Sequence, residues 1–542
     1  MEGSSLNDVE PLSEQDVVDE ALARDGQHYL AGWRLHAMTA ALFLSLFIAT
    51  LEVSIVSTSL VTITNALHAF GISSWIVVAY LLTYTGSLII WAKVSDIFGR
   101  KSIICLALLV FIVFSGACGA AQSIIQLVIF RVFQGIGGSG VYSMVMVIVP
   151  EMVPKPKFAA YSSFVSMVFA LSYLLGPVLG GVININGAWR WVFLLNVPCG
   201  AVALAFLLLV IPRAFPDHAV IERSKEKSPP KNMILRKLDF VGFLLLLAAS
   251  VFLVTALEEA GTQYKWSSAL VVILLVLAAL SWLGVIGWSW FVDHKETSVE
   301  PVFTWRFLQN RVFMGALLNT IFSGVPFTVA VIEIPQRFQA VNALSPLQAG
   351  LRFLPFALSS PVGAGISSVF VSKLKVPPVV IVILGSILQT IGAALMSTLP
   401  ASQIIIAENY GYQVILGFGL GLNIAGLMVL TPFVVEKRDL AVAMGAVTQF
   451  RIMGGALGLA IATNVLNTYV KSHLSASIAP QQVSTILSSA EEINVLDPAV
   501  RSTVRAIFGH GYNLQMKVLI GFGAAQIPAS LLMWGNHVKM PE

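Results

Sequence analysis

Two long apolar runs are joined by the short charged segment Ser95-Asp96-Ile97-Phe98-Gly99-Arg100-Lys101. The run before it, Trp75 to Trp91, and the run after it, Ile103 to Ala121, carry almost no charge. A run of about 20 mainly apolar residues is long enough to cross the hydrocarbon core of a bilayer as a helix. The segment therefore predicts a hinge between two membrane-spanning helices, which is typical of a transporter rather than of an anchored enzyme.

The composition of the whole chain also indicates an integral membrane protein in contact with the lipid bilayer. The 542 residues are 57% hydrophobic and only 11% charged, whereas soluble domains carry about 25% charged residues. The net charge is +4, and the basic residues lie in connecting loops rather than in one patch, which argues against a nucleic-acid partner. The three cysteines fall inside apolar runs, so we expect small core residues and no disulfide framework.

The predicted fold is an all-α membrane protein with fourteen spans, because fourteen segments have the required length and hydrophobicity. Of the 32 Lys and Arg residues, 22 fall on one side of these spans and 8 on the other. Basic residues accumulate on the cytoplasmic side, so we expect both termini in the cytoplasm. The expected spans are residues 37–62, 74–94, 102–121, 125–149, 160–183, 190–211, 239–258, 268–291, 312–334, 347–371, 378–398, 410–433, 441–466 and 516–535.

A long basic segment follows the sixth span and contains Ser228-Pro229-Pro230, which indicates a linker and a 6+2+6 arrangement. The first residues are acidic and polar, unlike a signal peptide. The predicted organisation is a disordered cytoplasmic tail (1–33), an N-terminal six-helix half (34–212), a cytoplasmic linker (213–238), two inserted helices (239–291), a second linker (292–311), a C-terminal six-helix half (312–535) with an external loop (471–515), and a cytoplasmic C-terminus (536–542).

Four charged side chains within the predicted spans stand out: Glu52, Arg131, Glu333 and Arg451. A charge at the bilayer centre costs about 2.5–3.5 kcal/mol, so each is a candidate functional residue. Glu52 could load and release a proton as its surroundings change; the alternative is a carboxylate that only hydrogen-bonds neighbouring helices. Glu333 either lines a vestibule or pairs with Arg337 at the rim. Arg131 and Arg451 either take part in function or pin helices together.

Small residues accompany two of the predicted spans. Positions three and four apart share one face of a helix, and such a face of the fourth span contains Arg131, Gln134, Gly135 and Gly138. The fifth span has a stripe of small residues that favours close helix packing, with a proline that favours a kink. The stripe consists of Ser172, Gly176 and Gly180, the proline is Pro177, and Gly181 follows the stripe. A smooth, bent helix suits a surface that slides or rocks; packing without motion is the alternative.

Together these motifs resemble the major facilitator superfamily, specifically the fourteen-span drug:proton antiporter group common in fungi. Residues 92–101 resemble the loop signature Gly-x-Leu-x-Asp-x-x-Gly-Arg-Lys, with Ala92 and Val94 replacing its first glycine and its leucine. Residues 127–139 resemble the fourth-span signature, which contains an arginine and a Gln-Gly pair. Residues 172–181 resemble the antiporter signature Gly-x-x-x-Gly-Pro-x-x-Gly-Gly, with Ser172 replacing the first glycine, and residues 189–198 and 345–355 are also similar to this group. Most of the group would show an aspartate where this chain has Glu52.

The resemblance implies alternating access, in which two six-span halves rock about a central cavity. It implies proton coupling through Glu52 and Arg131, and a conformational latch formed by Asp96, Gly99, Arg100 and Lys101. We expect an apolar, aromatic cavity with Tyr80, Tyr84, Gln134, Tyr142, Tyr173, Glu333 and Arg451 as candidate lining residues. We expect no cofactor and no metal; the ligands are protons and a small molecule, and the working unit is a single chain.

The leading functional hypothesis is proton-coupled export of drugs, toxins or secondary metabolites across the plasma membrane, with the vacuolar membrane as the other location. One alternative is proton-coupled uptake, for instance of iron–siderophore complexes. Another is a nutrient sensor on the same fold that does not transport. Enzyme activity is not expected, because the sequence contains no metal-ligand cluster, nucleophile elbow or phosphate-binding loop.

Overall fold

The computed structural model is helical in all its named elements. It describes residues 32–67, 74–154, 157–184, 188–211, 239–260, 264–295, 299, 301, 303–344, 346–436, 439–474 and 497–535. The predicted tail up to residue 31, the linker 213–238 and the C-terminal residues 536–542 lie outside the described residues.

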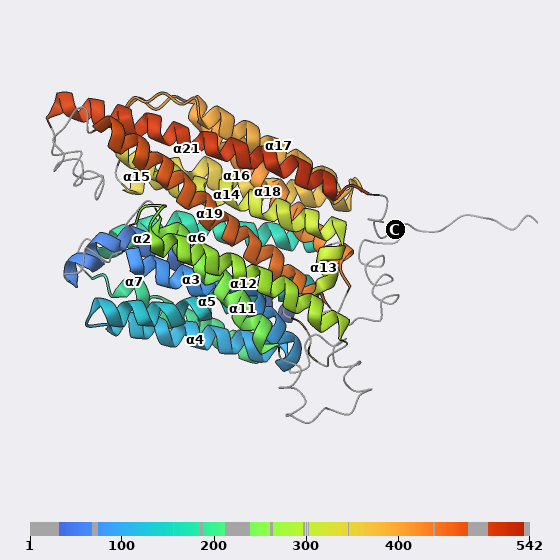
Figure 1. The fold of residues 1–542 in the computed structure, drawn as a ribbon. Coiled ribbons are helices and arrows are strands. Elements are labelled where there is room, and N and C mark those ends of the chain that lie inside the picture. The colour runs from blue at the N-terminus through green and yellow to red at the C-terminus, as the bar shows by residue number, and fades with distance from the viewer. Residues whose placement is uncertain are drawn as a thin grey trace, which may run out of the picture.

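The N-terminal helices pack into one bundle, drawn in blue and cyan in Figure 1. Within it, α3 and α4 pack against α5, while α2 packs against α5, α6 and α8. The helix α5 is the most enclosed of these long apolar helices, because 83% of its apolar stretch is buried. The members are α2 (Trp33–Ala66), α3 (Ser74–Phe98), α4 (Arg100–Ala120), α5 (Ile124–Met152), α6 (Phe158–Asn184), α7 (Trp191–Leu194) and α8 (Asn196–Val210).

The C-terminal helices form a second bundle, drawn from yellow to red in Figure 1. Here α18 packs against α16 and α17, while α14 packs against α19 and α21. The members are α13 (Trp305–Gln309), α14 (Arg311–Ala340), α15 (Pro346–Arg352), α16 (Leu354–Ser372), α17 (Pro378–Met396), α18 (Glu408–Val434), α19 (Leu440–Leu474) and α21 (Pro498–Leu532).

The two bundles meet along two seams. One seam is formed by α6 and α16, and the other by α3 and α19. The helices α11 (Phe240–Glu259) and α12 (Ala269–His294) pack against each other, and α11 lies over the second seam because it contacts both α3 and α19. In contrast, α12 lies at the periphery, because only 17% of its apolar stretch is buried.

Twelve of the described helical segments are long and apolar enough to cross a membrane. They lie in α2 to α5, α7 with α8, α11, α12, α14 and α16 to α19, and each overlaps one of the predicted spans. The predicted fifth and fourteenth spans correspond to α6 and α21, which do not meet the same criteria. The apolar stretch of α6 is short, Met167–Ile183, and the first half of α21 carries Arg501 and Arg505.

Three of the differences between the observed helix boundaries and the sequence prediction divide a span or shorten a loop. The sixth span is split at Leu195, three residues before Pro198, which lacks the backbone donor that a continuous helix requires. The tenth span is split at Phe353, with a proline at the start of α16. Both ends of the predicted external loop 471–515 are helical, because α19 extends to Leu474 and α21 begins at Pro498.

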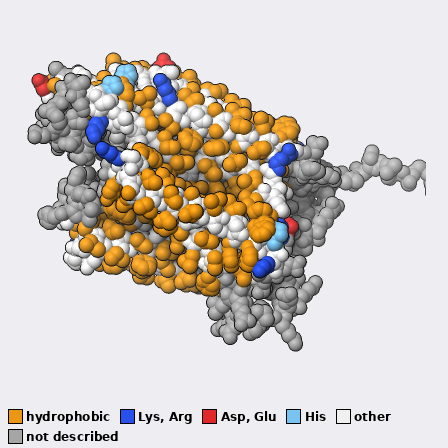
Figure 2. All heavy atoms as spheres, viewed as in Figure 1, with side chains coloured by type: hydrophobic (Ala, Val, Ile, Leu, Met, Phe, Trp, Pro, Cys, Tyr) orange, Lys and Arg blue, Asp and Glu red, His pale blue; other side chains and the backbone are white. Residues whose placement is uncertain are grey.

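Apolar side chains cover the face of the molecule shown in Figure 2 in a broad band, and the Lys, Arg, Asp and Glu side chains visible on that face lie near its two ends. Exposed large hydrophobic residues occur on α4, α8, α11, α12, α16 and α17. An exposed apolar surface of this extent is unfavourable in water and favourable in lipid. The structure is therefore that of a multi-pass membrane protein.

Candidate functional site

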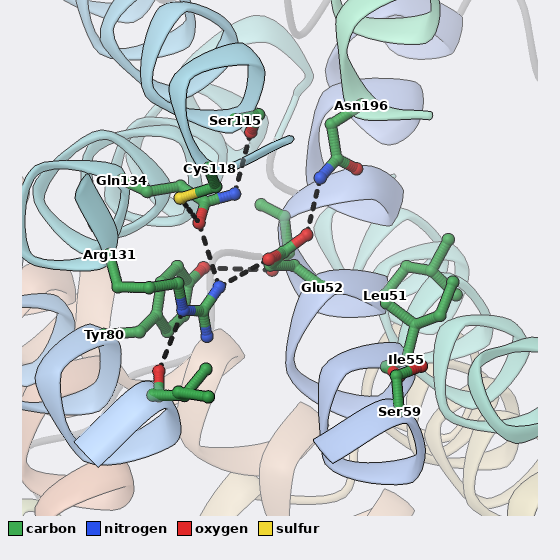
Figure 3. Close-up of polar contacts among 12 residues, drawn as sticks. Leu51, Glu52, Ile55, Ser59, Tyr80, Ser115, Cys118, Arg131, Gln134 and Asn196 are labelled. Carbon is green, nitrogen blue, oxygen red and sulfur yellow. Dashed lines mark hydrogen bonds and ion pairs between the residues drawn. The ribbon is translucent and has the colours of Figure 1, made fainter. Parts of the chain in front are cut away.

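The carboxyl group of Glu52 lies inside the N-terminal bundle and is completely buried. It forms an ion pair with the Arg131 guanidinium, whose side chain is 1% exposed. On its other side, the Glu52 Oε2 atom accepts a hydrogen bond from Asn196 Nδ2 at 2.5 Å. Figure 3 shows the carboxyl group between these two donors. One residue from each of α2, α5 and α8 therefore meets at a single buried carboxylate.

Further polar groups fix the position of the Arg131 guanidinium. Its Nε atom donates to the Ile76 carbonyl at 2.9 Å, and its Nη1 atom donates to Gln134 Oε1 at 2.9 Å. The Gln134 amide donates in turn to Ser115 Oγ at 2.8 Å. The guanidinium also lies over the Tyr80 ring, 4.3 Å from its centroid. These contacts extend the network into α3 and α4 (Figure 3). Several partners around a buried charge offset part of the free-energy cost of removing it from water.

Two glycines of α5 allow α3 to approach the guanidinium. A Cβ atom on Gly135 would lie 2.4 Å from the Tyr80 carbonyl oxygen, and one on Gly138 would lie 2.4 Å from the Tyr80 hydroxyl oxygen. The distances are far below van der Waals contact, so a side chain at either position would push the helices apart. The face that the spacing of residues 131, 134, 135 and 138 predicts is thus the one that packs on Tyr80.

The small residues of α6 pack on α2 at Thr50 and Ser54, which stand two residues before and two residues after Glu52. Ser172 Oγ accepts a hydrogen bond from Thr50 Oγ1 at 2.7 Å, and the Ser172 carbonyl accepts one from Ser54 Oγ at 3.1 Å. A Cβ atom on Gly176 would lie 2.0 Å from Ser54 Oγ. Gly181, by contrast, is exposed with open space around it. The side chain of Pro177 lies outside the described part of α6, and the helix continues through this position.

The charged segment that opens the sequence analysis joins α3 to α4. Gly99 has a φ angle of 90°, which favours glycine. Arg100 is the centre of an ion-pair cluster: its Nη1 atom lies 2.7 Å from Asp96 Oδ1, and its Nη2 atom lies 2.7 Å from Glu151 Oε1. Lys101 extends to α8, where its Nζ atom donates to the Leu208 carbonyl at 2.7 Å. The segment therefore ties α3, α4, α5 and α8 together at one end of the bundle.

Side chains on the second seam connect the two bundles. The Arg451 guanidinium of α19 donates to the Tyr142 hydroxyl of α5. Tyr142 lies edge-on to Tyr84, with ring centroids 5.9 Å apart, and Tyr84 stacks on Tyr80 at 5.5 Å. A continuous row of aromatic rings thus extends from the guanidinium of Arg131 to that of Arg451. The side chain of the fourth candidate tyrosine, Tyr173, lies outside the described part of the chain.

Glu333 lies buried in the C-terminal bundle, and the structure does not show the expected pairing with Arg337. The Arg337 guanidinium donates instead to Asn513 Oδ1 at 2.6 Å and to the Pro400 carbonyl at 3.0 Å. The side chain of Gln515 on α21 lies near the Glu333 carboxyl. The i, i+4 spacing on α14 permits an ion pair, but α21 and the segment before α18 offer Arg337 other partners.

Two residues of the Glu52 network were not singled out from the sequence. Asn196 is the only side-chain amide in the apolar run 191–210, which is a detectable signal for a buried hydrogen-bonding role. Ser115 has no comparable signal, because single serines are common in apolar helices and hydrogen-bond their own backbone.

Two helical bundles with a charged network buried inside one of them define a membrane protein of the transporter class. Residues 42–305 match the family model described as Major Facilitator Superfamily. The chain is 44% identical over 531 residues to the MFS-type transporter FPY5 of Fusarium mangiferae, covering 98% of this chain and 89% of that protein. The chain therefore belongs to the Major Facilitator Superfamily.

Other similar proteins extend the comparison. The MFS-type efflux pump LUC4 of a Fusarium species is 29% identical over 484 residues, covering 87% of this chain and 81% of that protein. The efflux pump FUS6 of Gibberella fujikuroi is 28% identical over 490 residues, covering 89% and 84%. Among solved structures, the proton:xylose symporter XylE matches with a TM-score of 0.57 at 14% identity, covering 92% of this chain and 95% of XylE. At that identity the match supports the fold alone.

Proposed function

We propose that this protein is a proton-coupled exporter of amphipathic small molecules that works by alternating access. The observation that carries the proposal is the buried ion pair between Glu52 and Arg131, with Asn196 as the second partner of the carboxylate. A proton on Glu52 would neutralise the carboxylate and leave the Arg131 charge without its counter-ion. Such a loss costs about 3–5 kcal/mol in a buried site. Proton uptake would therefore favour a different packing of α2, α5 and α8.

The substrate is proposed to bind between the bundles, close to the hydrogen bond from Arg451 to Tyr142. This bond crosses the seam, so a molecule entering between the bundles would compete for its polar atoms. Tyrosine offers an aromatic face and a hydroxyl, which suits amphipathic ligands. The residues proposed for this site remain Tyr80, Tyr84, Gln134, Tyr142, Tyr173, Glu333 and Arg451, of which Tyr80 and Gln134 also hold Arg131.

The charged segment is proposed to act as a latch. The Arg100 guanidinium holds acids from both α3 and α5, so the end of the bundle is stabilised while these ion pairs persist. Alternating access requires that contacts at one end form and break in each cycle. Loss of this cluster would shift the equilibrium toward the inward-facing state.

The proposed topology has fourteen spans in a 6+2+6 arrangement, with α6 and α21 counted as spans. Each packs lengthwise among helices that are candidate spans, α6 against α2 and α16, and α21 against α14 and α17. We propose that both termini are cytoplasmic, because of the distribution of Lys and Arg. The plasma membrane is the proposed location, with the vacuolar membrane as the alternative, and one chain is the proposed working unit.

Export is favoured over uptake by the similar proteins that are named efflux pumps, LUC4 and FUS6. The small-residue stripe of α6 that packs on α2, which resembles the antiporter signature, supports the same direction. Proton-coupled uptake, for example of an iron–siderophore complex, and a non-transporting sensor are the competing functions. Accumulation of substrate inside cells would identify the first, and the absence of any transported molecule would identify the second.

The test is expression in a yeast host that lacks its own drug pumps. Resistance and cellular accumulation are measured for a panel of toxins, with and without a proton uncoupler. We expect lower accumulation in expressing cells and loss of this difference with the uncoupler. The Glu52→Gln variant should behave like uncoupler treatment, whereas Glu408→Gln, a change of an exposed carboxylate at the start of α18, should behave like the wild type. Export that persists in the presence of the uncoupler would refute proton coupling.

A further inference from the structure

A second buried carboxylate, Glu333 of α14, lies in the C-terminal bundle with its oxygens incompletely satisfied. The Glu333 residue is 3% exposed, and its neighbour Gln515 of α21 is completely buried. Glu333 Oε2 and Gln515 Oε1 have no hydrogen-bond partner, while the Gln515 amide nitrogen donates to the Ala462 carbonyl at 3.1 Å. Both of the unsatisfied atoms are acceptors, so the site lacks a donor.

The cationic groups near α14 are engaged elsewhere, and among the described residues Glu333 forms no ion pair. Arg337, one turn away, donates to Asn513 and Pro400. On neighbouring helices, Arg451 of α19 donates to Tyr142, Arg352 of α15 donates to Tyr410 at 2.7 Å, and Arg306 of α13 pairs with Asp439.

The remaining charged groups on packed elements do not neutralise Glu333 either. Tyr512 of α21 interacts electrostatically with both Glu333 and Arg337, but its neutral phenol adds no positive charge. On the same helix, His510 and Lys517 are exposed, and Arg505 lies ten residues from Gln515, about 15 Å along the helix. The helix α17 carries no charged residue, and Glu408 of α18 is itself an exposed acid.

The two bundles place the same chemistry at corresponding helices. In the N-terminal bundle, Glu52 on the first helix is hydrogen-bonded to an amide, Asn196, on the last helix. In the C-terminal bundle, Glu333 on its first long helix lies near an amide, Gln515, on the last helix. The halves of this superfamily are structural repeats. The difference is the counter-ion: the first carboxylate has Arg131, and no cation takes that position in the second.

We propose that Glu333 is a second proton-binding site, which holds a proton in the conformation described here. An ionised carboxylate buried without a cation is strongly unfavourable. One added proton removes the charge and gives the carboxyl group an O–H donor. The Gln515 Oε1 atom, which has no partner, could accept the hydrogen bond from this donor. The inference deepens the proposed coupling mechanism by adding a carboxyl group to the cycle, yet the protonation itself holds whether or not the protein exports.

The test is infrared spectroscopy of the full-length protein in lipid nanodiscs at about pH 7, a pH at which exposed carboxyl groups are ionised. The C=O band of protonated carboxyl groups should decrease by one group per chain in Glu333→Gln. Glu408→Gln, at an exposed acid, should leave this band unchanged. Equal band areas in the wild type and Glu333→Gln would overturn the proposal.

Two further variants keep the test decisive if Glu333→Gln folds poorly. Gln515→Leu retains the carboxyl group and removes the proposed acceptor, so the band should persist and shift to higher frequency. Glu333→Asp shortens the side chain and should also shift the band without removing it. A band that does not move in either variant would contradict the assignment. Uncoupler-insensitive transport with an intact Glu333 band would reject the proposed function and leave this site in place.

Discussion

The Glu52→Gln substitution tests the central ion pair most directly, because it removes the charge and keeps the size of the side chain. Arg131 is 1% exposed, so water cannot replace the lost carboxylate. Removing one partner of a buried ion pair costs about 3–5 kcal/mol. The glutamine oxygen still accepts a hydrogen bond from Arg131, and a hydrogen bond to a charged group contributes about 1.5–3 kcal/mol. We therefore expect a loss of about 2 kcal/mol in the free energy of unfolding.

The assay combines unfolding of the purified protein with transport. Glu52→Ala removes the acceptor as well and should lose about 3–5 kcal/mol. The double variant Glu52→Gln/Arg131→Gln replaces the ion pair with two neutral amides, so its loss should be smaller than the sum of the single losses. In vesicles, Glu52→Gln should abolish accumulation against a gradient and retain downhill exchange.

Two results would refute the reasoning. The first is a Glu52→Gln variant as stable as the wild type, which would mean that the two charges do not stabilise each other. The second is uphill transport at the full rate, which would remove Glu52 from the coupling step even if the ion pair stabilises the fold. The Arg131→Gln single variant separates the stabilising role of the ion pair from its role in coupling, because it keeps the Glu52 carboxylate and removes its cation. A loss of stability with uphill transport intact would assign the ion pair to the fold alone.

Three further predictions concern other parts of the structure. Asn196→Leu leaves Glu52 Oε2 without its donor from α8, so the free energy of unfolding should fall by about 1.5–3 kcal/mol; unchanged stability in the same unfolding assay counts against the role of the amide. Gly176→Ala should lower the free energy of unfolding by about 1–3 kcal/mol through overpacking, while Gly181→Ala, which meets open space, should have no effect in the same unfolding assay. Asp96→Asn weakens a charge-assisted contact of the latch and should slow transport about tenfold at normal surface expression, measured by surface labelling and vesicle uptake.

The sequence allows the buried charges to be found, but not their partners. Glu52 and Arg131 are recognisable because a charge in an apolar run is costly wherever the run is placed. Their contact depends on the packing of α2 against α5, which joins positions 79 residues apart. Local spacing even suggests the wrong partner for Glu333, since Arg337 stands one turn away and yet binds groups on α21 and near residue 400.

Helix boundaries are also predictable only where they depend on the local sequence. Apolar length predicts the long central helices, because backbone groups in lipid must be satisfied within the helix. It fails for the first part of α21, where Arg501 and Arg505 suggest a loop. Hydrophobicity does not distinguish a helix that continues beyond the apolar band from a loop that begins at its edge.

The position of α11 makes the two seams unequal as routes from the lipid. On the α3–α19 seam, Gln449 of α19 donates to Ser250 of α11 at 2.9 Å, and Asn464 of α19 donates to the Ala260 carbonyl at 2.9 Å. At the α6–α16 seam, the described helices that contact both partners are α15 and α18, which belong to the C-terminal bundle itself, so no inserted helix covers this seam as α11 covers the other. A lipid-soluble molecule that approaches from within the bilayer would therefore meet α11 at the α3–α19 seam. On the other side it would meet the small residues of α6, next to the helix that carries Glu52.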